Sequence, residues 1–447
     1  MQISVLCAVL FIEAFSPLRV GKLFFAISEF RINFLMRIAL LLVNCFLFLV
    51  ASAQYSMPHE ESPHEGTWLQ WPHNYTYGSG AEDVEASWVD MTKALAVGER
   101  VHIIAYDADQ IVDIANMLQA ADVNMEQVDY QICQNDDFWV RDNGPIFAQD
   151  ESGEWLILDW GFNGWGGDAP FELDDAVPSV IAANINIPVI DLSAMVLEGG
   201  AIEVDGQGTL MATRSSITGD DRNPGLTEAE IEDYLSQYLG AQQIIWLDGE
   251  FGGTEDITDQ HIDGFVKFVG NHTLVTMNDV DLAYWYVGTD DRNIIDQAAN
   301  TEGTPYQRVN LPLTQFPVQT TSGQNVGFRS SYVNFYVGNG VVLVPEYDDP
   351  KDEVALNIIQ GLYPDRTAIG INCQNMLLWG GMVHCVTQQQ PLGSGTTTVP
   401  ENPFQRDHGR CIRRIDFRGR EIERLTPGQP CIQLYEDGWA QVVVQGN

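Results

Sequence analysis

The chain has 447 residues, of which 45% are hydrophobic, and its 62 acidic and 22 basic residues give a formal net charge of −40. This composition excludes a disordered protein and suffices for one large globular domain or two ordinary ones. The negative charge argues against nucleic acid and anionic membranes as partners, and it would concentrate a cationic ligand. A solvated acidic surface without such a ligand is the alternative that charge leaves open.

The N-terminal residues carry the pattern of an export signal. A basic residue precedes the apolar run 38–50, which ends in the small residues 51–53, and this order is typical of a secretory signal peptide. We therefore expect an upstream extension or mis-assigned start at 1–35, a signal peptide at 36–53, and a secreted or extracytoplasmic protein. The run is short for a membrane span, so no membrane partner is expected beyond export. Anchoring helices within 3–50 are the alternative.

Four segments predict β-hairpins, because two alternating strand patterns flank a turn signal in each. The hairpins are expected within residues 139–162, 197–217, 260–279 and 331–350. Helices are predicted at 227–240, where Thr227 and Glu230 fit a capping box, and at 351–363. A fifth unit begins near Gly380, and its partner strands are expected at 67–73 and 100–106.

A strand hairpin plus a helix, repeated along the chain, is a unit that cannot bury its apolar face alone. We therefore predict an α/β fold in which five such units pack around a shared axis as a closed ring. The same end of every unit faces the centre of a ring, so the residues that open the hairpins should converge. These residues are Asp142, Glu198, His261, Asp263, Asn334 and Cys385.

The strong acidic charge ends with the main domain, which we place at 54–393. This domain has 11 basic and 53 acidic residues, whereas 394–447 has seven of each. The segment 391–403 is rich in Pro, Gly, Ser and Thr, as in linkers, so we expect residues 394–447 to form a linker and a small β-rich module. Cys411 and Cys431 lie in this module and are predicted to pair, since a disulfide would stabilise so small a unit.

The pair His384-Cys385 resembles a catalytic dyad, but the flanking residues favour a strand. Successive side chains of a strand point to opposite faces, so His384 is predicted to face away from Cys385 and to have a structural role. A nucleophilic thiol needs a cation and a base. We assign both roles to His261, oriented by a carboxylate such as Glu198.

Two further carboxylates, Asp142 and Asp263, exceed what attack on an amide or ester requires. They are explained by a guanidinium substrate, which accepts two carboxylates in a fixed geometry and whose charge would help to hold Cys385 as a thiolate. Alternatively, Asp142 is only a turn residue and His261 a hydrogen-bonded core histidine. A zinc site would leave the extra carboxylates unexplained and its usual spacings are missing, so no metal is predicted.

Seven stretches of the sequence resemble the agmatine deiminase family, which includes the Porphyromonas-type peptidylarginine deiminases. They are WLQWPH, DDFWVRDNGPIF, GFNGWGG, LEGGAIEVDGQGT, TDQHIDGFVKF, SYVNFYV and GGMVHCVTQQQP. The resemblance implies the pentein fold, a five-bladed α/β propeller, and guanidine hydrolysis without a cofactor through a covalent amidino-thioether. By position, it implies Cys385 as the nucleophile and His261 as the acid and base. It also implies that Glu198 orients the histidine and that Asp142 and Asp263 hold the guanidinium.

The resemblance leaves agmatine, arginyl peptides and free arginine as substrates. Related peptidylarginine deiminases grip a terminal carboxylate with arginines, but residues 155–213 contain no Lys or Arg, so agmatine is the leading prediction. Export favours arginyl peptides instead, because polyamine synthesis is normally intracellular. The predicted substrate-site residues are Trp71, Trp139, Trp160, Trp165, Asn334, Gly380 and Gly381, the two glycines as room for a flat guanidinium.

Three residues depart from the family's usual pattern. They are Gln260, where family members usually have glycine, and Trp379 and Met382, where they have smaller or polar residues. All the catalytic residue types are present, so we expect the protein to be active. We expect the three departures to affect the choice of substrate. An amidinotransferase of the same fold and an inactive cation-binding propeller are the rival predictions, and the sequence leaves the oligomeric state open.

Overall fold

The computed structural model describes residues 55–250, 256–270, 272–393, 410–423, 425 and 429–444. The predicted extension at 1–35, the predicted signal peptide at 36–53 and residues 394–403 of the predicted linker lie outside these ranges. The described residues belong to one unit, Ala53–Asn447. No helix among them is long and apolar enough to cross a bilayer.

Each predicted hairpin is present and is followed by a third strand that runs parallel to the second, with helix between them. The first such unit contains β5 (Ile146–Asp150), β6 (Trp155–Gly161), α7 (Gly164–Gly167), α8 (Val177–Ile185) and β7 (Val189–Val196), and β1 (Tyr55–Ser56) pairs with β5. The second contains β8 (Ile202–Val204), β9 (Thr209–Thr213), α9 (Arg214–Thr218), α10 (Glu228–Leu239) and β10 (Gln243–Leu247). The predicted capping box of Thr227 and Glu230 at the start of α10 is confirmed.

The third and fourth units repeat the pattern. They contain β11 (Lys267–Val269), β12 (Thr273–Met277), α11 (Asp279–Tyr284), α12 (Thr289–Gln297) and β13 (Gln307–Leu311), then β14 (Tyr336–Val337), β15 (Val341–Glu346), α13 (Asp352–Leu362) and β16 (Thr367–Asn372). The second strands β9 and β12 lie between two neighbours, and their residues are almost all buried. Strands covered on both faces favour such continuous apolar sequences.

The fifth unit joins the two ends of the main domain, as predicted. Strand β17 (Gln388–Pro391) pairs antiparallel with β2 (His64–Gln70), which pairs in parallel with β3 (Arg100–Ala105). The remaining elements of this part are α3 (Asn74–Tyr77), η1 (Gly78–Asp83), α4 (Glu85–Leu95), α5 (Ala108–Ala120), η2 (Met125–Gln127) and β4 (Val128–Ile132). The predicted α/β class is therefore confirmed, with five sheets in the described residues.

The C-terminal strands extend the sheet of the fifth unit. They are β18 (Cys411–Ile415), β19 (Pro430–Tyr435) and β20 (Trp439–Val444), and β20 pairs antiparallel with β4, which makes a sheet of seven strands. Cys411 and Cys431 are both free thiols, so the predicted disulfide is wrong. The register explains why: Cys411 lies opposite Tyr435, four residues along β19 from Cys431.

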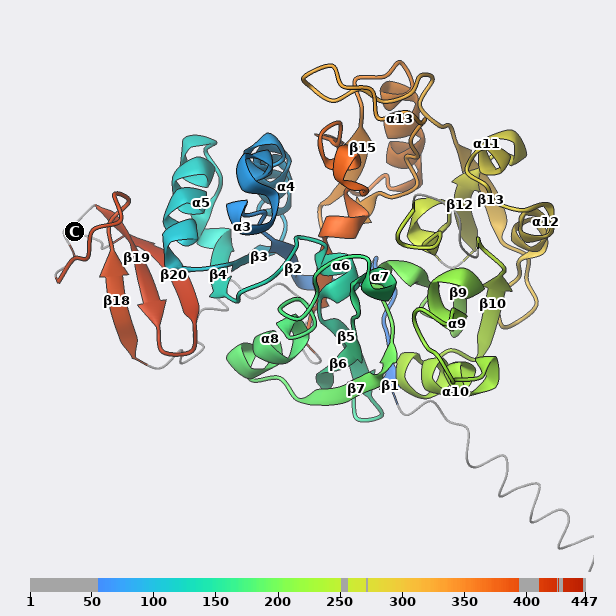
Figure 1. The fold of residues 1–447 in the computed structure, drawn as a ribbon, viewed down its shortest axis with the longest axis horizontal. Coiled ribbons are helices and arrows are strands. Elements are labelled where there is room, and N and C mark those ends of the chain that lie inside the picture. The colour runs from blue at the N-terminus through green and yellow to red at the C-terminus, as the bar shows by residue number, and fades with distance from the viewer. Residues whose placement is uncertain are drawn as a thin grey trace, which may run out of the picture. The chain divides into compact units, whose positions relative to one another are not determined.

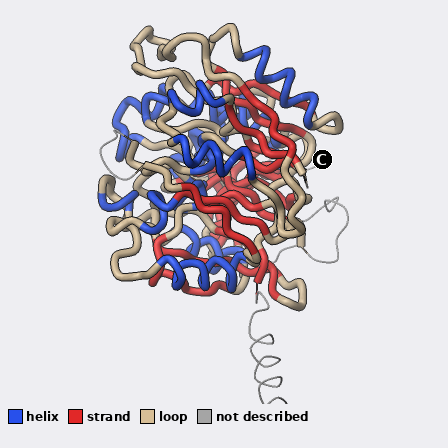
Figure 2. The backbone as a smooth tube through the Cα atoms, turned by 90° about the vertical axis from the view of Figure 1, so that its right-hand side faces the viewer, coloured by secondary structure: helices blue, strands red, loops and turns tan. Residues whose placement is uncertain are grey.

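Short helical turns at the openings of the hairpins carry most of the candidate residues. They are α6 (Val140–Asn143), η3 (Gly199–Ala201), η4 (Ile262–Gly264) and η6 (His384–Val386), the last preceded by η5 (Met376–Trp379). In Figure 1 the sheets follow one another in chain order, and α6 and α7 lie near the middle of the view. Figure 2 shows the strands running through the interior and most helices on the outside. The candidate residues are thus held by turns anchored to buried strands.

Candidate active site

Cys385 lies in the 3₁₀ turn η6, so the strand predicted around it is wrong. The Thr387 hydroxyl donates to the carbonyl oxygens of Val383 and His384, both at 3.1 Å. The His384 N–H donates to Asn334 Oδ1 at 2.9 Å. Such bonds between side chains and the local backbone compete with strand pairing, and here they outweigh the β-propensity of the flanking residues.

The Cys385 thiol faces the amide of Asn334, whose Nδ2 lies 3.4 Å from Sγ. The same nitrogen donates to the carbonyl oxygen of Asp263 at 3.3 Å, so Asn334 ties the two turns together. Burial, with the negative charges of Asp263 and Asp142, raises the pKa of Cys385 well above its usual value. The free protein therefore holds a thiol here, and a cation bound between these carboxylates would favour the thiolate.

His261 directly precedes η4 and lies near the carboxylates of Glu198, Asp142 and Asp263. Its Nε2 lies 2.7 Å from Glu198 Oε2, and its Nδ1 lies 3.6 Å from Asp142 Oδ1. Burial would lower the pKa of His261, but the charges of Asp142 and Glu198 and the hydrogen bond to Glu198 together raise it to about 9. The imidazole is therefore protonated at neutral pH, and Nδ1 is the nitrogen that faces Asp142.

Glu198 is held in turn by Arg222, which the sequence analysis missed. The Arg222 guanidinium is fully buried and its Nε donates to Glu198 Oε1 at 2.7 Å. Its other nitrogens donate to Asp221 at 2.8 Å, to Asp259 at 2.9 Å and to the carbonyl oxygen of Ile257 at 2.9 Å. A single arginine within the acidic stretch GDDRNP, beyond a long segment without basic residues, was the available sequence signal.

Asp142 lies at the end of α6 and is fixed by two donors. Trp165 Nε1 donates to Oδ2 at 3.1 Å, and the Gly200 N–H donates to Oδ1 at 3.0 Å. Burial, with the charges of Asp263 and Glu198, outweighs the opposing charge of His261 and raises the pKa of Asp142 to about 6. The prediction that Asp142 and Trp165 belong to one site is consistent with this contact.

Gly200 is a second residue that the sequence analysis did not single out. A Cβ atom at this position would lie 2.6 Å from His261 Nδ1, 2.7 Å from Asp142 Oδ1 and 3.1 Å from Asp263 Oδ2. The first two distances are too short for a methyl group, and the third is tight. Gly200 therefore lies among the polar groups and allows all three side chains to approach one another.

Asp263 is bound by the histidine that was predicted to be only structural. His384 Nδ1 lies 2.8 Å from Asp263 Oδ2. Burial raises the pKa of Asp263, but the hydrogen bond from His384 and the nearby positive charges lower it overall. Asp263 is therefore ionised at neutral pH. The two ring nitrogens of His384 lie 2.8 Å from Asp263 and 2.7 Å from Glu60, so this histidine contacts the carboxylate that was predicted to hold the guanidinium.

The two predicted glycines differ in their surroundings, and their role as room for a guanidinium stays a prediction: the space next to Gly380 is open, whereas that next to Gly381 is not. The space next to Gly381 is filled by the indole of Trp139, which a Cβ atom at Gly381 would overlap. Gly380 has φ 107°, a backbone conformation that favours glycine. The aromatic residue Trp139 therefore packs directly against the segment that leads to Cys385.

The other predicted tryptophans lie in the core. Trp71 is fully buried and its indole N–H donates to Glu85 at 2.9 Å. Trp160 belongs to a different hydrophobic cluster from Trp71, Trp139 and Trp165, and it packs against Tyr234 and Tyr238. A role for Trp71 in the substrate site stays a prediction, whereas Trp160 packs against two tyrosines of α10.

The unusual residue Gln260 adopts φ 68°, in the region that favours glycine. Its carbonyl oxygen accepts from Thr213 Oγ1 at 2.9 Å, and its Nε2 donates to the Trp285 carbonyl oxygen at 2.8 Å. These bonds hold a strained residue directly before His261. Met382 is buried and its sulfur accepts from Ser330, whereas Trp379 is exposed.

Comparison with known proteins identifies relatives of the whole main domain. The Porphyromonas-type peptidyl-arginine deiminase family matches residues 56–391. The agmatine deiminase of Pseudomonas aeruginosa (strain LESB58) is 32% identical over 360 residues, which cover 75% of this chain and 95% of that protein.

Solved structures of the same kind align over a similar length. The agmatine deiminase of Enterococcus faecalis has 27% identity and a TM-score of 0.67, and covers 76% of this chain and 98% of its own. A Cys-to-Ser variant of C. jejuni agmatine deiminase, solved with substrate bound, has 25% identity and a TM-score of 0.64, and covers 76% of this chain and 97% of its own. The predicted resemblance is confirmed, and the chain belongs to the Porphyromonas-type peptidyl-arginine deiminase family.

Proposed function

We propose that this protein is a guanidine iminohydrolase that converts agmatine and water to N-carbamoylputrescine and ammonia. One observation carries the proposal: Cys385, Asp142 and the pair of His261 and Asp263 come from separate segments and meet in one cluster. In it, His261 Nδ1 lies 3.6 Å from Asp142 Oδ1, and the Asn334 amide joins Cys385 to Asp263. Two carboxylates suit a planar guanidinium with several N–H donors. A thiol and an imidazolium supply a nucleophile and a proton donor.

The first half of the reaction forms a covalent intermediate. The guanidinium binds between Asp142 and Asp263, and its charge offsets the two carboxylates that raise the pKa of Cys385, so the thiol releases its proton to solvent. Cys385 Sγ then bonds to the guanidinium carbon and gives a tetrahedral adduct. His261 donates its proton to the departing nitrogen, the C–N bond breaks, and ammonia leaves an amidino-thioether on Cys385.

The second half regenerates the protein. His261, now neutral, accepts a proton from a water molecule, whose oxygen bonds to the amidino carbon. The C–S bond breaks, and the remaining hydroxyl proton passes to the departing sulfur, which restores the Cys385 thiol while His261 keeps the proton taken from water. The ammonia released in the first half takes up from solvent the proton that the thiol gave up there. The net products are the ureido compound and ammonium. Glu198, fixed by Arg222, keeps Nδ1 of His261 directed at the reacting groups throughout.

The nearby arginines are already paired with groups of the protein, which supports agmatine over a substrate with a carboxylate. Arg222 donates to Glu198, Asp221, Asp259 and Ile257, and Arg141 donates to the His384 carbonyl oxygen and lies 3.6 Å from Glu60. Both guanidinium groups therefore already have carboxylate or carbonyl partners within the protein. An arginyl peptide is the second candidate, favoured by the predicted export, and arginine within a peptide also lacks a free carboxylate.

Product analysis distinguishes these functions. The wild-type protein should release ammonia and a ureido product from agmatine, with lower kcat/KM for free arginine and for peptides with internal or C-terminal arginine. Cys385→Ala should abolish release while keeping the fold. Unchanged release by Cys385→Ala would refute the mechanism. A substituted guanidine formed in the presence of a second amine would instead identify an amidinotransferase, and failure of an electrophilic amidine to label Cys385 would favour an inactive binding protein.

The finer architecture is also part of the proposal. We infer that the five sheets are the blades of a closed five-bladed propeller around the site. The repeated hairpin, helix and parallel strand support it, as does the pairing of β17 near the end of the domain with β2 at its start. Solution scattering that fits an open arrangement of the sheets better than a ring would contradict it.

We further propose that the protein is exported and begins near Gln54 after cleavage. The apolar run 38–50 and the small residues 51–53 support this, and both precede the family match, which starts at residue 56. N-terminal sequencing of the protein recovered outside the cytoplasm should start near Gln54. Recovery only from the cytoplasm with residues 36–53 intact would rule export out.

A further inference from the structure

Glu60 is a buried carboxylate that the proposed reaction leaves unused. It lies between β1 and β2 and is 7% exposed. Its Oε2 lies 2.7 Å from His384 Nε2, 3.0 Å from Lys267 Nζ and 3.6 Å from an Arg141 nitrogen. Its Oε1 accepts from the Val337 N–H at 2.9 Å. Glu60 belongs to residues 57–63, the N-terminal segment between β1 and β2, and its side chain thus contacts residues of four of the units.

His384 connects this carboxylate to the site. Its Nδ1 lies 2.8 Å from Asp263 Oδ2 and its Nε2 lies 2.7 Å from Glu60 Oε2, so both ring nitrogens face carboxylate oxygens. A neutral imidazole can donate from only one nitrogen. Both contacts are hydrogen bonds only if the ring carries two protons and links Asp263 to Glu60.

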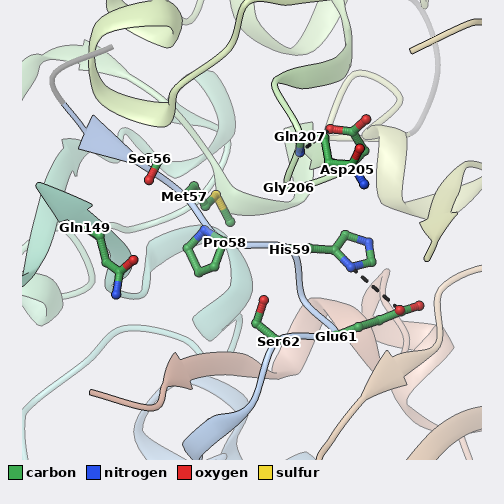
Figure 3. A pocket seen from close by; sticks show the side chains of 10 residues that line it. All are labelled: Ser56, Met57, Pro58, His59, Glu61, Ser62, Gln149, Asp205, Gly206 and Gln207. Carbon is green, nitrogen blue, oxygen red and sulfur yellow. Dashed lines mark hydrogen bonds and ion pairs between the residues drawn. The ribbon is translucent and has the colours of Figure 1, made fainter. Parts of the chain in front are cut away.

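The N-terminal segment presents Glu60 to the interior and its neighbours to the surface. His59 and Glu61 line a depression of about 510 Å³ together with Asp205 and Gly206, and their side chains lie 3.8 Å apart (Figure 3). The Glu61 carboxylate also accepts from the Gly270 N–H at 3.0 Å. Two adjacent glutamates therefore differ in surroundings, and only Glu60 contacts His384.

Asp263 needs such support because like charges surround it. Asp142 and Glu198 lie in the same cluster, and the carboxylate of Asp263 is almost completely buried. Without a donor on Oδ2, Asp263 would be free to rotate away from its neighbours or to take up a proton. The positive charges of Lys267 and Arg141 balance the negative charge of Glu60. Glu203 is a further acidic group near His384.

We infer that Glu60 and His384 are positioning residues, which fix the orientation and the ionised state of Asp263 for binding a guanidinium. The inference rests on the proposed function for the identity of the ligand. Glu60 touches no substrate. It acts through the ring of His384, whose two nitrogens lie 2.8 Å from Asp263 and 2.7 Å from Glu60. Residues 57–63, between β1 and β2, thereby belong to the active site although they lie outside the hairpin openings.

Binding to an inactive protein tests the inference without interference from chemistry. In a Cys385→Ala background, Glu60→Gln keeps an oxygen for Val337 but replaces Oε2 by an amide, which cannot accept from His384. We expect the Kd for agmatine to rise about 10- to 100-fold, as for loss of a hydrogen bond to a charged group. Glu61→Gln, in the same segment, is the matched control and should leave the Kd within about twofold. Equal Kd values for the two variants would overturn the inference.

A second background separates positioning from a general structural effect. His384→Asn keeps a donor near Asp263 but cannot reach Glu60, so adding Glu60→Gln to it should have no further effect on the Kd. A purely structural Glu60 would weaken binding equally in both backgrounds, because independent effects add. Such additivity would also overturn the inference.

The protonation of His384 can be measured in the wild-type protein, which covers the case in which a variant fails to fold. In ¹⁵N-histidine spectra at pH 7, assigned with His384→Asn or His384→Gln, both ring nitrogens of His384 should carry protons. A single ring proton would refute the link. If the wild-type protein neither binds agmatine nor releases ammonia, the proposed function fails, and these spectra still decide whether His384 joins Asp263 to Glu60.

Discussion

Replacing Gly200 by alanine should disable the active site while leaving the fold intact. The added Cβ would lie 2.6 Å from His261 Nδ1, whereas ordinary contacts begin near 3.4 Å, so the imidazole or Gly200 must move by about 0.8 Å. The Asp142 carboxylate at 2.7 Å must move by a similar amount. A misplacement of about 1 Å near the reacting groups costs roughly 10²-fold in rate, so kcat for agmatine should fall about 100-fold. Overpacking at one position costs about 1–3 kcal/mol of stability.

The assay is release of ammonia from agmatine, with kcat and KM determined for Gly200→Ala and for a control. Gly361→Ala is the control, because Gly361 lies in α13 and a Cβ there would meet nothing within 4 Å. It should keep full activity and gain about 0.5–1 kcal/mol, since alanine is favoured over glycine in a helix. Wild-type kcat in a folded Gly200→Ala would refute the packing of His261, Asp142 and Asp263 around Gly200.

Three other predictions concern charge and thiols. The kcat/KM for agmatine should fall below pH 6, because Asp142, with a pKa of about 6, gains a proton there. It should also fall above pH 9, because His261, with a pKa of about 9, loses its proton. A flat profile from pH 5 to about 10 would contradict these assignments. Arg222→Met leaves the buried Glu198 with His261 but without its arginine partner, so denaturant unfolding should show a loss of about 3–5 kcal/mol and kcat for agmatine should fall; unchanged stability would mean that His261 alone suffices to hold Glu198. Thiol titration of the unfolded, unreduced protein without residues 1–53 should find all of Cys133, Cys373, Cys385, Cys411 and Cys431 reactive, and a missing pair would restore the rejected disulfide.

The repeated units could be predicted from the sequence because their determinants are local. Turns such as Asp205-Gly206 and the capping box at Thr227 are written in a few adjacent residues, and the strands follow from alternating apolar positions. The equivalence of the units then predicted which residues open each hairpin. The structure brings Asp142, Glu198 and His261 together and places Asn334 in contact with both Cys385 and Asp263.

The errors and omissions all depend on contacts between distant segments. The turn at His384 forms because Asn334 and Thr387 bind its backbone, which the strand propensity of its neighbours does not reveal. Glu60 contacts His384, which is more than 300 residues away along the chain, and Arg222 appears as an ordinary charged residue until its partners are known. The need for a glycine at position 381 comes from Trp139, a residue more than 200 positions away whose indole fills the space beside it.

The most direct test is to trap the covalent intermediate. Wild-type protein should be mixed with agmatine, quenched in acid during turnover and digested, and the peptide that contains Cys385 should be examined by mass spectrometry. The account predicts an amidine adduct on Cys385 that is absent from Cys385→Ser treated in the same way. Release of ammonia from agmatine by Cys385→Ser at the wild-type rate, without an adduct in either protein, would contradict it.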